Sequence, residues 1–244
     1  MNWNPTWICP ANDLGDPAAV FGTSFVFEKK ITHANLTITA MGVYEAKLNG
    51  RRVGQFVMAP GWTSYHKRLQ YQKYDITDLL TNGKNEIEVT VGKGWYRSPL
   101  PGWLGCAYQD ELRSRPCGLA AQITLTFEDG SSKILSTDES WKVSDGPVRF
   151  SEIYDGEIYN SAKTPLLDQP VTIFDGPTDT LILQQGEEVC EQERLAVKKV
   201  FVTPNGETVL DFGQNMTGYV ELFVNAKAGD CVDLSFAEVM DKEG

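Results

Sequence analysis

The apolar and polar positions of this chain alternate in short stretches that are separated by turn residues. Three such stretches are Asn85-Glu-Ile-Glu-Val-Thr-Val91, Ala121-Gln-Ile-Thr-Leu-Thr-Phe127 and Tyr219-Val-Glu-Leu-Phe-Val-Asn225, and alternation of this kind is typical of β-strands. Between the stretches lie pairs that favour the positive φ angles of hairpin turns: Asn49-Gly50, Asn82-Gly83, Asp129-Gly130 and Asn205-Gly206. No stretch keeps apolar residues at helical spacing over three turns. The pattern therefore predicts an all-β fold, with a single helical turn at residues 75–80.

The number and spacing of the predicted strands favour a β-sandwich. Many short strands with turns at intervals of about 8–12 residues are typical of such folds, and a jelly roll closes a sheet pair of this size. Residues 163–180 concentrate Pro, Asp and Gly, which indicates a domain boundary. We predict a jelly-roll (galactose-binding-like) β-sandwich over residues 1–170, followed by an incomplete second β-sandwich segment over residues 171–244. The later strands either form this truncated second sandwich or pack on the first domain.

The short C-terminal segment also predicts self-association. A domain as small as residues 180–244 buries only about 60% of the surface that its unfolded chain exposes. An apolar face without a partner favours association. We therefore expect a homo-oligomer that forms through these strands.

The charge balance argues against two classes of partner. Lys and Arg total 22 against 33 Asp and Glu, which gives a net charge of −11. The electrostatic field of this negative net charge repels phosphate backbones and anionic lipid surfaces. Neither nucleic acid nor a membrane is therefore an expected partner. The sequence has no apolar run of the roughly 20 residues that a membrane span needs, and its first ten residues do not have the pattern of an export signal. The five cysteines are scattered, without a Cys-x-x-Cys pair, which predicts reduced thiols in a cytoplasmic protein.

No motif in the sequence predicts catalysis or a metal site. Glycosidases need two carboxyl groups on either side of the scissile bond, and no local pattern singles out such a pair. The chain has no Gly-x-Ser-x-Gly elbow and only two histidines, His33 and His66. Neither these histidines nor the cysteines have the spacing of zinc ligands. We therefore predict no catalytic residue, no metal ligand and no cofactor from the residues alone.

The segment of residues 94–113, which is rich in aromatic and charged residues, is the candidate binding site. Aromatic faces contact the C–H side of a sugar ring, while Arg and carboxylate groups hydrogen-bond its hydroxyls. The segment predicts a carbohydrate-binding loop with the residues Trp95, Tyr96, Arg97, Trp103, Asp110 and Glu111. The alternative is that Trp95 and Tyr96 pack in the core or between domains. Trp62 and Tyr65 are also expected to be structural, because the Pro60-Gly61 turn would direct Trp62 inward.

Several motifs, in order along the chain, resemble one known family. They include Pro60-Gly-Trp-Thr-Ser-Tyr-His-Lys-Arg68, Gly92-Lys-Gly-Trp-Tyr-Arg97, Tyr154-Asp-Gly-Glu-Ile-Tyr159 and Asp211-Phe-Gly-Gln-Asn-Met-Thr-Gly-Tyr219. With these motifs the chain resembles the N-terminal, non-catalytic β-sandwich region of bacterial α-L-rhamnosidases of glycoside hydrolase family 78. The resemblance extends over nearly the whole chain and implies that residues 171–244 are the start of a concanavalin-like domain.

The resemblance implies an accessory role. The parent enzyme would remove terminal L-rhamnose from glycosides by inversion, with its acid and base on an (α/α)6 domain that this chain does not include. The chain itself would support that catalytic domain and would not be catalytic. Alternatively, it would be a carbohydrate-binding module for rhamnose-containing glycans. Calcium, which takes oxygen ligands, remains open as a cofactor, with Asp110 and Glu111 as candidate ligands.

Overall fold

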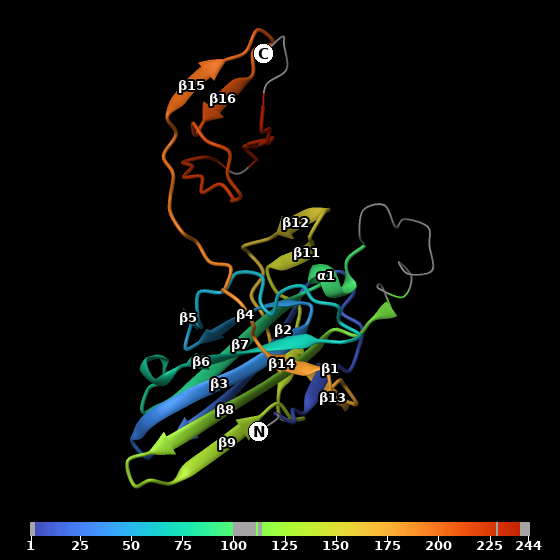
Figure 1. Ribbon diagram of the computed structural model, residues 1–244, viewed down its shortest axis with the longest axis vertical. Helices are drawn as coiled ribbons and strands as arrows, with labels where there is room; N and C mark the ends of the chain where they lie inside the picture. Colours follow the sequence, from blue (N-terminus) through green and yellow to red (C-terminus); the bar gives the residue numbers. More distant parts are fainter. Residues whose placement is uncertain (1–2, 100–110, 112–113, 228, 240–244) are drawn as a thin grey trace. The chain divides into compact units, whose positions relative to one another are not determined.

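The computed structural model of the chain contains two compact units (Figure 1). The first unit, Met1–Cys190, consists mainly of two β-sheets packed face to face. The structure describes residues 3–99, 111, 114–227 and 229–239. One sheet contains β1 (Trp7–Pro10), β3 (Ile31–Met41), β6 (Leu69–Asp75), β8 (Gly118–Phe127), β9 (Ser132–Ser136) and β14 (Leu181–Leu183). The other contains β2 (Ala19–Phe27), β4 (Val43–Leu48), β5 (Arg51–Arg52), β7 (Gly83–Gly92) and β10 (Lys142–Ser144). The predicted all-β sandwich is confirmed.

The strand β13 (Gln169–Phe174) joins the two sheets into one curled, 12-stranded sheet. Its last four residues pair with β1, from Val171↔Pro10 to Phe174↔Trp7. Its first two residues pair with β10. The strand therefore passes from one layer of the sandwich to the other. A separate hairpin is formed by β11 (Val148–Glu152) and β12 (Gly156–Tyr159).

The core lies between the two layers and follows the predicted alternation. Along β7, Ile87, Val89 and Val91 are buried, while the residues between them are more exposed. The same holds in β8, where Ile123 and Leu125 face inward. Burying an aliphatic side chain of this size contributes roughly 1.5–3 kcal/mol. The period of two therefore determines which face of each strand packs in the core.

A polar network is buried at the end of the sandwich where β14 joins β6. The Tyr44 hydroxyl donates to Gln72 Oε1 (2.7 Å) and lies 3.2 Å from the Tyr74 hydroxyl. Gln72 Nε2 donates to Gln184 Oε1 (2.8 Å), and the Gln185 amide donates to Gln70 Oε1 (3.0 Å). Burial raises the pKa of Tyr44 well above its ordinary value, so its hydroxyl stays a donor at neutral pH. These bonds attach residues 184 and 185 to β6.

The predicted helical turn is confirmed as a short 3-10 helix, η1 (Thr77–Leu79). The Asp75 carboxylate accepts hydrogen bonds from the Thr77 amide (2.9 Å) and hydroxyl (2.6 Å). Among the residues described, no helix is long and apolar enough to cross a membrane.

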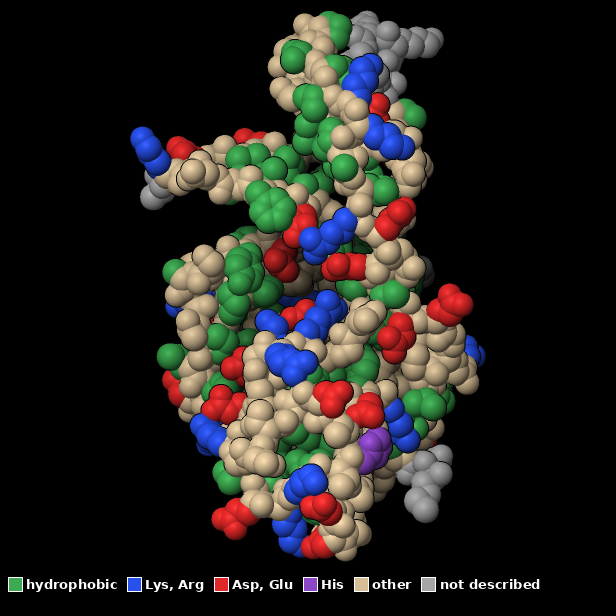
Figure 2. Space-filling view, turned by 90° about the vertical axis from the view of Figure 1, so that its left-hand side faces the viewer, with side chains coloured by type: hydrophobic (Ala, Val, Ile, Leu, Met, Phe, Trp, Pro, Cys, Tyr) green, Lys and Arg blue, Asp and Glu red, His purple; other side chains and the backbone are tan. Residues whose placement is uncertain are grey.

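The second unit, Glu191–Gly244, contains the hairpin of β15 (Lys199–Val202) and β16 (Thr208–Asp211). The predicted turn at Asn205-Gly206 lies between these strands. The strand predicted at residues 219–225 is wrong, because no partner strand is described for it and the segment has no strand conformation. Figure 2 shows hydrophobic side chains on the surface of this unit, where Phe223, Phe236 and Val239 are 85%, 75% and 82% exposed. Self-association through this segment stays a prediction.

The strands that follow residue 170 do not all lie in the second unit. β13 and β14 pair with strands of the first unit, which extends to Cys190. Packing on the first domain was one of the two arrangements expected for the strands of residues 180–244, and β14 adopts it. The domain division at residue 170 stays a prediction of the sequence.

The buried network predicts the effect of removing one amide. Gln72→Met keeps the approximate length of the side chain but removes the oxygen that accepts from the Tyr44 hydroxyl and the amide that donates to the Gln184 side-chain oxygen. The free energy of unfolding should fall by about 1–3 kcal/mol, as measured by urea denaturation. Gln185→Met, which alters an exposed side chain in the same segment, is the matched control. Equal denaturation midpoints for both variants would show that the network does not stabilise the fold.

Candidate functional site

Four aromatic side chains form a cluster that joins two separate segments of the sequence. This aromatic cluster consists of Trp62, Tyr65, Trp95 and Tyr96. The rings of Trp62 and Trp95 are stacked, with their centroids 5.9 Å apart and an interplanar angle of 8°. Tyr65 meets Tyr96 edge-on, at 5.1 Å and 80°. Trp62 is 59% exposed, so the cluster presents indole surface to solvent.

The position of Trp95 and Tyr96 depends on a single helical turn, α1 (Gly94–Arg97), directly after β7. The Ser98 amide donates to the Gly94 carbonyl (3.1 Å) and closes the turn. Gly94 has φ +54°, and a Cβ atom there would lie 2.6 Å from Val43 Cγ1. A loop without a helix was expected here, and that expectation is wrong. A turn of four residues is too short to produce a helical pattern of apolar positions.

The opposite side of the cluster is a tight loop between Ala59 and Arg68. The amides of Lys67 and Arg68 both donate to the Ser64 carbonyl, at 2.8 and 2.9 Å. The Tyr65 hydroxyl donates to the Gly61 carbonyl (3.3 Å). The expectation that this turn directs Trp62 inward is wrong: the loop closes on itself through Tyr65 and leaves Trp62 outside, against Trp95.

A charged group borders the cluster. The Arg115 guanidinium lies 5.0 Å from the Tyr96 ring centroid and donates to Glu111 Oε1 (2.7 Å) and His66 Nε2 (3.2 Å). The hydrogen bond from Arg115 lowers the pKa of Glu111, and burial raises the pKa of Tyr96. The border thus combines a carboxylate, a guanidinium and an imidazole on the Tyr96 side of the cluster. Groups of this kind can hydrogen-bond sugar hydroxyls while the ring contacts C–H groups.

The structure divides the six residues predicted for the carbohydrate site. Trp95, Tyr96 and Glu111 lie together in or beside the aromatic cluster. Arg97 lines a different part of the surface. Trp103 and Asp110 lie outside the described residues. The structure adds four residues to the site that the sequence did not predict there: Trp62, Tyr65, His66 and Arg115. Three of them belong to the Pro60–Arg68 motif, but its contact with α1 has no signal in the sequence.

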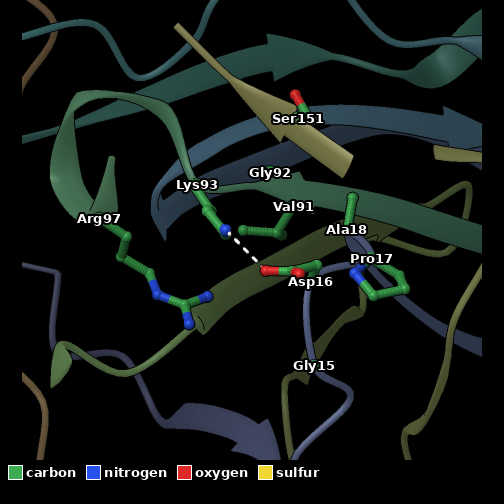
Figure 3. Close-up of a pocket in the computed structure, with 9 residues that line it drawn as sticks. All are labelled: Gly15, Asp16, Pro17, Ala18, Val91, Gly92, Lys93, Arg97 and Ser151. Carbon is green, nitrogen blue, oxygen red and sulfur yellow. Dashed lines mark hydrogen bonds and ion pairs between the residues drawn. The ribbon is translucent and has the colours of Figure 1, made fainter. Parts of the chain in front are cut away.

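Arg97 lines a small hollow of about 10 Å³ together with Lys93 and Asp16 (Figure 3). The Lys93 ammonium bonds to Asp16 (3.1 Å) and Glu152 (2.7 Å) and lies 5.0 Å from the Phe150 ring centroid. Burial lowers the pKa of Lys93, but the hydrogen bonds to the two carboxylates outweigh it, so this pKa is raised. Lys93 is therefore a paired cation.

Glycoside hydrolysis and metal binding each require a particular group of side chains. A glycosidase needs two carboxyl groups on either side of the bond that it cleaves. The small hollow is lined by one carboxylate, Asp16, and a neighbouring larger cavity by one other, Asp13. In the part of the chain that the structure describes, no group of three or more His, Cys, Asp or Glu side chains could hold a metal ion.

Comparison with protein families matches two stretches of the chain. The α-L-rhamnosidase N-terminal domain matches residues 29–193. The bacterial α-L-rhamnosidase concanavalin-like domain matches residues 201–244.

Individual relatives agree with these matches. An α-L-rhamnosidase of Streptomyces avermitilis is 36% identical over 227 residues, which are 88% of this chain and 22% of that protein. One from Formosa agariphila is 32% identical over 232 residues, which are 90% of this chain and 24% of that protein. The chain thus spans less than two thirds of the length of these relatives.

Solved structures of two relatives have the same fold. The native α-L-rhamnosidase of Aspergillus terreus superposes with a TM-score of 0.78 at 36% identity, over 87% of this chain and 26% of that one. The Streptomyces avermitilis α-L-rhamnosidase complexed with L-rhamnose gives a TM-score of 0.71 at 34% identity, over 82% of this chain and 20% of that one.

The ion pair beside the cluster predicts a change in pKa. Arg115→Gln removes the hydrogen bond to the Glu111 carboxylate, so the pKa of Glu111 should rise toward its ordinary value in a carbon-13 NMR titration. The pair stabilises the fold above the unfolded-state pKa of Glu111, and this contribution is lost as the pH falls through the lowered folded-state pKa. Arg68→Gln makes the same charge change on the neighbouring loop. An equal rise of the Glu111 pKa in both variants would contradict the pairing.

Proposed function

We propose that this chain, which belongs to the family of the α-L-rhamnosidase N-terminal domain, is the accessory portion of an enzyme that hydrolyses terminal L-rhamnose from glycosides. The match of this family over residues 29–193 is the observation that carries the proposal. The shared fold of the Aspergillus terreus enzyme supports it. The parent would act by inversion, with one carboxylic acid protonating the leaving oxygen and one carboxylate activating water.

Within such an enzyme, the chain would give structural support to an (α/α)6 catalytic domain. The first unit has the properties of a support, because β13 joins its two sheets and one large cluster of buried side chains packs between them. The second unit exposes large apolar side chains, and surfaces of this kind mark contacts with other protein elements. The catalytic domain of the full-length protein is thus the proposed partner.

The accessory role predicts no hydrolysis by the chain alone. The purified chain should release no nitrophenol from 4-nitrophenyl α-L-rhamnopyranoside above the buffer rate. The full-length protein that contains this chain should release it, but should not cleave 4-nitrophenyl β-D-glucopyranoside at a comparable rate. Hydrolysis by the chain itself would contradict the accessory role. A full-length protein that cleaves only the glucoside would contradict the substrate.

A second function, carbohydrate binding by the chain itself, is favoured by the aromatic cluster. Among the described aromatic side chains of the first unit, the exposed ones are Trp62, Tyr154 and Tyr159, and Trp62 presents its ring to solvent while it stacks on Trp95. Arg115 lies over the Tyr96 ring of the same cluster and is paired with Glu111, so these two residues supply polar groups at its border. An exposed aromatic face with charged neighbours is the arrangement that a sugar ring requires. This module would hold rhamnose-containing glycans near the parent enzyme.

Removal of the exposed indole tests this second function. Calorimetric titration with L-rhamnose should give saturable heat, and Trp62→Ala should weaken binding by about fivefold, which corresponds to roughly 1 kcal/mol for one aromatic contact. Tyr154→Ala removes another exposed aromatic side chain of the first unit and should leave binding unchanged. Absence of heat up to millimolar sugar would leave structural support as the role of the chain.

A further inference from the structure

A second cavity, distinct from the aromatic cluster, lies where the segment between β1 and β2 meets the start of β8. Its volume is about 180 Å³. Its walls include apolar groups of Pro10, Leu14 and Pro17, the thiols of Cys9 and Cys117, and the side chain of Arg97. A dry cavity of about 150 Å³ can hold a benzene molecule. This cavity can therefore hold a ligand of about six to eight non-hydrogen atoms.

Arg97 is the cation of this cavity and has no carboxylate partner among the described residues. Its Nε is buried and makes no hydrogen bond. The Arg97 guanidinium lies beside the Cys117 thiol and is hydrogen-bonded to it. Burial raises the pKa of this thiol to about 11, although the hydrogen bond with Arg97 lowers it. A neutral thiol is a weak partner. Lys93, which lines the adjoining hollow, differs from Arg97 because it bonds to two carboxylates, Asp16 (Figure 3) and Glu152.

The nearby acidic groups limit the charge of a ligand. Asp16 is paired with Lys93, and Asp13, which lines the cavity, accepts a hydrogen bond from the Gly15 amide (2.9 Å). The Asp13 carboxylate and the net charge of −11 disfavour a dianion such as phosphate. A monoanion with two oxygens in a plane suits a guanidinium, because it accepts two parallel hydrogen bonds.

We propose that this cavity binds a small carboxylate, with Arg97 as the group that recognises its two oxygens. The apolar wall packs against the carbon chain, and Asn12, at the same cavity, can bond to a hydroxyl group. The ligand is a hydroxy acid or the carboxyl end of a uronic acid. Binding gives the Arg97 guanidinium at the cavity wall a partner of opposite charge, which no carboxylate among the described residues supplies. The site does not depend on rhamnose recognition or on the proposed parent enzyme.

Calorimetric titrations of the chain with sodium glycerate, sodium D-glucuronate and D-glucose test the proposal. At least one carboxylate should bind saturably, and neutral D-glucose should not. Binding of glycerate alone identifies a small hydroxy acid, and binding of glucuronate alone identifies a sugar acid. Arg97→Lys keeps the charge but loses the planar fork and should weaken binding at least about tenfold; Arg97→Gln should abolish it. Arg194→Gln, in the second unit, is the control and should bind as the original chain does.

The result that overturns the proposal is a lack of saturable heat with either carboxylate up to about 10 mM, well above a millimolar dissociation constant. Equal binding by Arg97→Gln would overturn it as well. A second measurement does not need an Arg97 variant that folds. The bound carboxylate should slow the reaction of Cys9 with N-ethylmaleimide, followed by peptide mass spectrometry, and leave the exposed Cys231 unaffected. An unchanged rate at Cys9 under saturating carboxylate would show that the ligand is not in this cavity.

Discussion

The passage of β13 between the two sheets is the constraint on which the first unit depends. The strand pairs with β10 through residues 169 and 170 and with β1 through residues 171–174. These pairings hold the N-terminal strand in the sandwich, although the partners Trp7 and Phe174 are 167 positions apart in the sequence. Closing such a long loop costs conformational entropy, which the buried core must offset. The pairing of β1 also fixes the start of the segment that connects β1 to β2. This segment forms one wall of the Arg97 cavity.

The single helical turn α1 directs the side chains of Trp95 and Arg97 to different surfaces. Successive residues of an α-helix are rotated by about 100°, because one turn takes 3.6 residues. Trp95 and Arg97 are two positions apart, so their side chains leave α1 in nearly opposite directions. Trp95 stacks on Trp62, and Arg97 lines the cavity beside Cys117. One motif of consecutive residues thereby supplies two different binding surfaces at one end of the sandwich.

The two surfaces differ in the chemistry that they offer. The aromatic cluster combines a broad ring face with hydrogen-bonding groups whose charges are paired in the Glu111–Arg115 bond. A neutral polyhydroxylated ring suits such a surface. The cavity has a guanidinium, that of Arg97, in its wall, and a guanidinium suits a carboxylate. An accessory portion with both surfaces would hold different chemical groups without catalysing their reaction.

The sequence by itself determined the all-β class, the inward positions of β7 and β8, the turn at Asn205-Gly206 and the resemblance to rhamnosidases. These features depend on local alternation, on turn residues and on motifs, all of which can be read along the chain. It also indicated Trp95, Tyr96 and Glu111 as site residues. Only the tertiary structure decided that Trp62 faces outward, that Arg115 joins Glu111 to Tyr96, and that Arg97 belongs to another cavity. These contacts form between segments distant in sequence, and their energies depend on packing that no local pattern encodes.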